Sequence, residues 1–128
     1  MNAVAATGVG TTASVKDYRH KVITITAALN SSLTFKFQAS NGVSVTSDAE
    51  PTFSSAQAVA NLWDYVGVYD LESGSFIAGE TGVTIDNASV ASNTRRYLVN
   101  DDHCSYLNIE VTAYTDGQIS AVGSFAND

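Results

Sequence analysis

The sequence is short of the residues that many binding and catalytic classes require. Only one of its 128 residues is cysteine, so Cys104 can form neither an internal disulfide nor a zinc site built from several thiolates. Six lysines and arginines stand against thirteen aspartates and glutamates, which gives a net charge of −7. Nucleic acids are bound through clustered positive charge, so we expect no nucleic-acid partner.

Long apolar runs and a basic start are missing as well. No stretch approaches the roughly 18 apolar residues of a membrane-spanning helix, so we expect no membrane partner. Residues 1–14 lack the basic start and the leucine-rich segment of a secretory signal, which disfavours export by that route. Charged residues make up only 15% of the chain, and serine, threonine and alanine take their place. This composition is typical of sheets with hydroxylated outer faces.

Residues suited to catalysis are few, and they do not form a recognisable set. Residues 101–104 read Asp-Asp-His-Cys, but neighbours in an extended chain point to opposite sides and cannot converge as nucleophile, base and orienting group. Asp70 and Glu72 flank a turn, yet calcium needs more oxygen ligands at set spacing. Neither a glycine-rich phosphate loop nor a Gly-x-Ser-x-Gly motif is present. We therefore expect no enzymatic activity, no metal and no cofactor.

The first 15 residues are small and uncharged, and they include two glycines. Such a segment buries too little side chain to become ordered by itself. We expect an extended arm that lies either against its own domain or against a neighbouring subunit, where it could add a strand to a sheet edge. Residues 16–128 then form a single domain of ordinary size. The candidate contact residues of the arm are Val4, Val9, Thr11, Thr12 and Val15.

Alternation of apolar and polar residues predicts strands along most of the remaining chain. The expected strands lie at 22–26, 33–38, 63–71, 75–78, 83–85, 95–99, 106–115 and 118–125. Asp116 and Gly117 form a two-residue hairpin signal of type I′, in which both residues need positive φ. Seven or eight short strands without a long helix predict an all-β fold, an antiparallel β-sandwich or a barrel.

Two segments allow finer predictions. In the longest expected strand, the inward-facing residues are Leu107, Ile109, Val111 and Ala113. Residues 54–62 are the one stretch compatible with a helix, because Ser54 and Gln57 match the capping-box pattern. Two turns make only a marginal helix, so this stretch is equally compatible with an extended connection.

Aromatic residues gather in the expected strand 63–71. Alternation places Trp63, Tyr65 and Tyr69 on one face of that strand. Such a stripe has three interpretations: a part of the core, a protein interface in which Tyr65 and Tyr69 make contacts, or a platform for sugar rings. In the sugar interpretation, Trp63 and Tyr65 stack on the ring and Asp64 binds beside them.

The second half of the chain resembles small structural proteins of tailed bacteriophages, head-decoration or cement proteins among them. The resemblance covers roughly residues 50–125 and consists of turn and strand consensus rather than a catalytic signature. It is carried by five motifs: Trp63-Asp64-Tyr65-Val66, Val68-x-Asp70-Leu71-Glu72-x-Gly74, Gly79-x-Thr81-Gly82-Val83, Arg95-Arg96-Tyr97-x-Val99-Asn100 and Val111-Thr112-x-Tyr114-Thr115-x-Gly117-x-Ile119.

The resemblance implies a non-enzymatic virion component that is assembled in the host cytoplasm and repeated by symmetry. Its partners would be copies of itself and a larger capsid protein or tail protein, contacted through the arm and the sheet edges. Two alternatives stay open. One is a carbohydrate-binding or receptor-binding module, and the other is a tail-tube or head–tail connector subunit.

Overall fold

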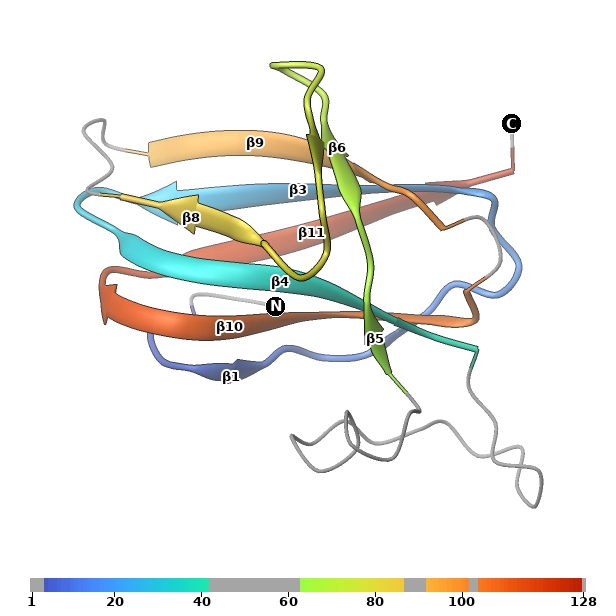
Figure 1. Cartoon of the computed structure of the whole chain (residues 1–128), viewed down its shortest axis with the longest axis horizontal. Helices are drawn as coiled ribbons and strands as arrows, with labels where there is room; N and C mark the ends of the chain where they lie inside the picture. Colours follow the sequence, from blue (N-terminus) through green and yellow to red (C-terminus); the bar gives the residue numbers. More distant parts are fainter. Residues whose placement is uncertain (1–3, 42–62, 87–91, 102–103, 128) are drawn as a thin grey trace.

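The computed structural model describes residues 4–41, 63–86, 92–101 and 104–127. These residues form a β-sandwich of two antiparallel sheets, as the alternating sequence predicts (Figure 1). Sheet 1 contains β1 (Gly8–Val9), β2 (Ala13–Ser14), β10 (Tyr106–Asp116), β4 (Ser32–Ser40), β5 (Asp64–Tyr65) and β8 (Val83–Ile85). Sheet 2 contains, in spatial order, β11 (Ile119–Ala126), β3 (His20–Ala28), β9 (Ser92–Val99), β6 (Val68–Asp70) and β7 (Phe76–Ile77).

The core lies between the sheets and is built from the inward positions of the long strands. On β4, Phe35 and Phe37 are almost completely buried, as their alternation with threonine and lysine predicts. Tyr97 from β9 meets both rings, with centroids 6.1 Å from Phe35 and 5.5 Å from Phe37. Each aromatic side chain of this size buries about 150–250 Å². The three rings therefore join the two sheets at the centre of the sandwich.

The predicted hairpin at Asp116 and Gly117 is wrong, because β10 pairs with β4 in sheet 1 and β11 pairs with β3 in sheet 2, so the turn between them connects the two sheets and is not a type I′ hairpin turn. Gly117 has a φ of +84°, whereas Asp116 is the last residue of β10 and is not in the positive-φ region. Gly117 also packs so closely on Ser31 that a Cβ atom there would overlap the Ser31 side chain. Glycine is therefore required at position 117 both for its backbone conformation and for space.

The expected inward position of Ala113 is wrong. The register between β10 and β4 shifts between Val111 and Ala113, which marks a β-bulge or a similar irregularity. Val111 is 1% exposed, while Ala113 is exposed. An extra residue on one strand reverses the alternation beyond it, so the prediction holds for Leu107, Ile109 and Val111 and fails for Ala113.

The expected single strand at 63–71 is two strands that belong to different sheets. The N–H of Val66 donates to Phe37 of β4 in sheet 1, whereas the carbonyl of Gly67 accepts from Asn100, directly after β9 of sheet 2. The chain therefore changes sheets at Val66 and Gly67 and returns to sheet 1 at β8. This excursion runs across one open side of the sandwich and projects beyond β9 (Figure 1).

The arm runs extended along its own domain and touches both sheets. Val4 forms a two-hydrogen-bond bridge with Ile119 of β11, and β1 and β2 then pair with β10. The N–H of Val15 donates to the carbonyl of Ser105, and the Val15 side chain is fully buried. In this single chain the arm lies against its own domain, which is one of the two positions expected from the sequence.

The helix-compatible residues 54–62 lie outside the described residues. Within the described ranges, no helix has the length and apolar character needed to cross a membrane.

Candidate functional site

The outer face of sheet 1 carries a polar cluster where β4, β5 and β10 meet. Alternation turns Lys36 and Gln38 of β4 away from the core, opposite the inward Phe35 and Phe37. The register then places Lys36 beside Glu110 of β10, and Gln38 beside Tyr65 of β5. Three strands that are distant in sequence thus bring one amide, one phenol, one ammonium and one carboxylate to the same face.

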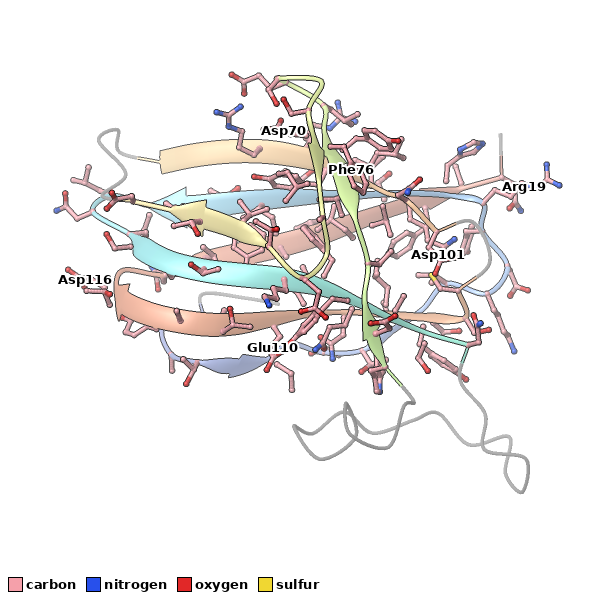
Figure 2. All side chains as sticks on the ribbon, in the orientation of Figure 1. Arg19, Asp70, Phe76, Asp101, Glu110 and Asp116 are labelled. Atoms are coloured by element: carbon pink, nitrogen blue, oxygen red, sulfur yellow. The ribbon has the colours of Figure 1, made fainter. Side chains whose placement is uncertain are left out.

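Glu110 is the centre of this cluster. Its Oε2 atom accepts a 2.7 Å hydrogen bond from the Tyr65 hydroxyl and a 2.8 Å hydrogen bond from Gln38 Nε2. Figure 2 shows Glu110 on β10, close to β5. Burial, followed by the hydrogen bond and negative charge of Glu110, raises the pKa of Tyr65 to about 12. The phenol therefore stays protonated near neutral pH and remains a donor to Glu110.

Lys36 covers the ring of Tyr65. Its Nζ atom lies 4.4 Å from the ring centroid, which is cation–π distance, and 3.7 Å from a carboxylate oxygen of Glu80. The Glu80 side chain is 80% exposed, so this ion pair is largely solvated and contributes little to stability. The ammonium thus lies close to both the Tyr65 ring and the Glu80 carboxylate.

A small pocket opens beside this cluster, with a volume of about 120 Å³. It is lined by Gln38, Trp63, Asp64, Tyr65 and Glu80. Gln38 is 1% exposed, and its Oε1 atom is buried without a hydrogen-bond donor in the part of the chain that the structure describes. A 180° rotation of the Gln38 amide would place Oε1, an acceptor, against the Glu110 carboxylate, which is also an acceptor. The hydrogen bond to Glu110 therefore favours the orientation in which Nε2 faces the carboxylate.

Comparisons of this chain with family models, with curated proteins and with solved structures gave no match. The site is therefore interpreted from its own geometry.

The structure divides the predicted aromatic stripe. Trp63, Asp64 and Tyr65 come together at the pocket, but Trp63 is only 4% exposed and lies outside the main hydrophobic cluster. Tyr69 is on sheet 2, 39% exposed, with its ring 5.2 Å from that of Phe76. The change of sheet at residues 66 and 67 separates them, so a continuous stripe over 63–69 is wrong.

The five candidate residues of the arm differ in their surroundings. Val9 and Thr11 are exposed, Val4 is half-buried, and Val15 is fully buried. Thr12 accepts a 3.2 Å hydrogen bond from the side-chain amide of Asn108. The arm is thus attached mainly by its main chain, with Val15 as its apolar anchor.

The carboxylates singled out in the sequence are paired with the chain's own groups. Arg95 lies 3.5 Å from Asp70 and 3.0 Å from Glu72 on the hairpin that carries Asp70 and Phe76 in Figure 2. The Sγ atom of Cys104 lies 3.8 Å from the Asp101 carbonyl, and residues 102 and 103 are outside the described ranges. Among the described residues, no three His, Cys, Asp or Glu side chains form a group able to hold a metal ion.

Sequence reasoning did not identify Lys36, Gln38, Glu80 and Glu110 as site residues. The sequence contained one signal: alternation along two long strands turns Lys36, Gln38 and Glu110 away from the core, and this places them on the outer surface of a sheet. Alternation does not show which outward-facing residues of different strands become neighbours.

Proposed function

We propose that this chain is a non-enzymatic virion structural protein, a capsid-decoration protein that binds a phage head through its N-terminal arm and its sheet edges. The resemblance of residues 50–125 to phage structural proteins suggests the setting. The arm is attached to its own domain mainly through main-chain hydrogen bonds, and this observation is the main support for binding through the arm.

The arm is held by contacts that another chain could supply. The N–H of Val4 donates to Ile119 over 2.8 Å, and the N–H of Gly10 donates to Ile109 over 2.9 Å. Main-chain hydrogen bonds make few demands on side chains, and most side chains of residues 5–11 are exposed. The same bonds can therefore form with the sheet edge of a neighbouring subunit, as in strand exchange between identical copies.

The edge of sheet 2 is the second element of the proposal. β11 pairs with β3 along one edge. Among the described residues, its other edge is paired through the bridge between Val4 and Ile119. Val122, in the middle of β11, is 68% exposed. A strand edge with an exposed apolar residue favours association with another strand, and repetition on a lattice multiplies weak contacts into firm attachment.

The test compares four forms of the protein on head shells assembled from the same phage genome. These are the full chain, a deletion of residues 1–14, Gly10→Pro, which removes the N–H bonded to Ile109, and Ala6→Pro as a matched control. Ala6 is exposed, and its N–H donates to no other described residue.

We expect the full chain and Ala6→Pro to saturate the shell, while the deletion and Gly10→Pro lose occupancy at least tenfold and keep their β-sheet circular dichroism. Undiminished occupancy by the deletion variant would reject the role of the arm. Binding of the full chain to tail tubes or connectors instead of shells would replace decoration with that function.

A further inference from the structure

We propose that the pocket beside Trp63 binds a saccharide through the sugar's hydroxyl groups. This inference concerns a second surface and goes beyond the proposed function, since it stands whether or not the arm binds a particle. The proposal depends on which hydrogen-bonding groups line the pocket and on which of them already have a partner within the chain.

The pocket presents acceptors. Gln38, whose Oε1 atom is buried without a donor in the described structure, lines the pocket together with the exposed side chains of Asp64 and Glu80. A buried acceptor without a donor is unfavourable, and a ligand that supplies one removes this cost. The complementary ligand therefore carries several hydrogen-bond donors close together, as the adjacent hydroxyls of a sugar ring do.

The acceptor at Gln38 is held in place by its neighbours. Gln38 Nε2 donates to Glu110, and Glu110 also accepts from the Tyr65 hydroxyl, so the amide has one preferred orientation. Groups that are positioned before binding lose little conformational freedom when the ligand arrives. Glu110 thus acts as a positioning residue for Gln38 and Tyr65.

The arrangement favours a neutral ligand over an organic cation. The cation–π position on the Tyr65 ring is already taken by the chain's own Lys36, whose Nζ atom lies 4.4 Å from the centroid. Asp64 and Glu80, which line the pocket, remain as hydroxyl acceptors.

The size of the pocket sets how much of the sugar enters. About 120 Å³ is several times the space that one water molecule needs, but it is below the usual volume of a site that encloses a whole ligand. Trp63, at 4% exposed, forms a wall rather than an open stacking platform. We therefore expect one hydroxyl-bearing edge of a ring to bind, with the rest of the glycan in solvent.

Titration of the full chain with individual sugars tests the proposal. The probes are glucose, galactose, mannose and N-acetylglucosamine and their disaccharides, with choline chloride as the cation probe. The readouts are calorimetry and the fluorescence of Trp63, which is the only tryptophan of the chain and lines the pocket.

We expect saturable binding of at least one sugar and a rise in its Kd of about two- to tenfold in Asp64→Asn and in Glu80→Gln, whose exposed side chains can change without unfolding the protein. Gln38→Met should abolish binding, and Asp86→Asn, an exposed carboxylate outside the pocket, should leave it unchanged. Failure of every sugar to bind, binding of choline alone, or sugar binding that the three pocket variants do not weaken would overturn the proposal.

Discussion

The side-chain ammonium of Lys21 donates a 2.8 Å hydrogen bond to the backbone carbonyl oxygen of Asp101. Lys21 is an inward residue of β3 and is fully buried, whereas Asp101 follows the end of β9. A buried ammonium is costly unless it is hydrogen-bonded, so this contact both gives one of its three N–H groups an acceptor and joins β3 to the segment after β9.

Replacing Lys21 should therefore lower stability by an amount that depends on the size of the new side chain. Lys21→Ala removes the buried stem and the hydrogen bond, and we expect a loss of about 2–4 kcal/mol in the free energy of unfolding. Lys21→Met keeps most of the volume and removes a buried charge, so its loss should be about 1 kcal/mol or less. Urea denaturation measures both, with exposed Lys16→Ala as control. Equal stability of all three variants would contradict this account.

Two tyrosines should make stability fall in alkaline solution. Burial, with a contribution from the Asp70 carboxylate, raises the pKa of Tyr97 to about 12, and the pKa of Tyr65 is also raised to about 12. The unfolded value is about 10, so the folded state holds these protons more tightly and the stabilisation is complete below pH 10. It is lost as the pH rises from 10 toward 12, by at most about 1.4 kcal/mol per pH unit for each tyrosine.

Phenolate absorbance and unfolding curves between pH 9 and 12 check this prediction. Tyr97→Phe should flatten the fall in stability across the alkaline range. If all six tyrosines of the folded protein ionised in one step near pH 10, the prediction would fail.

Gly117→Ala and Gly74→Ala form a matched pair. Both glycines have positive φ, +84° and +72°, but a Cβ atom at position 117 would overlap Ser31, whereas position 74 opens into free space. Each alanine costs about 1–2 kcal/mol of backbone strain, and Gly117→Ala adds the displacement of Ser31. We expect the larger fall in melting temperature for Gly117→Ala; the reverse order would contradict the close approach.

Asp70 and Glu72 both form ion pairs with Arg95, but we expect the Asp70 side chain to contribute more to the free energy of unfolding. Asp70 Oδ1 also accepts hydrogen bonds from the N–H groups of Glu72 and Ser73, at 2.9 and 3.4 Å, and so shapes the turn after β6. The Glu72 side chain is 69% exposed and forms a solvated ion pair with Arg95. Asp70→Ala should therefore lower the free energy of unfolding by about 1 kcal/mol, and Glu72→Ala by less than about 0.5 kcal/mol. Calorimetry at two salt concentrations distinguishes the turn contribution from the ion pair.

The strands of the sandwich were predictable because burial of one face imposes a period of two. Phe35 and Phe37 alternate with polar residues and are buried as expected. The same period continues from Trp63 to Tyr69, however, while the chain leaves sheet 1 for sheet 2 in between. Alternation records which side is apolar and not which sheet a strand joins, so it cannot reveal such a crossing or the irregularity near Ala113.

The candidate pocket was predictable only in part. Trp63, Asp64 and Tyr65 are adjacent in sequence, so their proximity needed no tertiary information. Gln38 and Glu110 are 72 residues apart, and only the register of β4 against β10 brings them into contact. That register arises from packing of the whole sandwich.

The order of the strands also sets how the protein can be made. β10 lies inside sheet 1 between the arm and β4, and β11 pairs with β3 in sheet 2, so both sheets depend on strands from the last quarter of the chain. A ribosome-bound chain that lacks β10 and β11 exposes the apolar faces of β3 and β4. Acquisition of the native state is thus postponed until β10 and β11 have been synthesised, and such distant pairings proceed in milliseconds to seconds rather than microseconds.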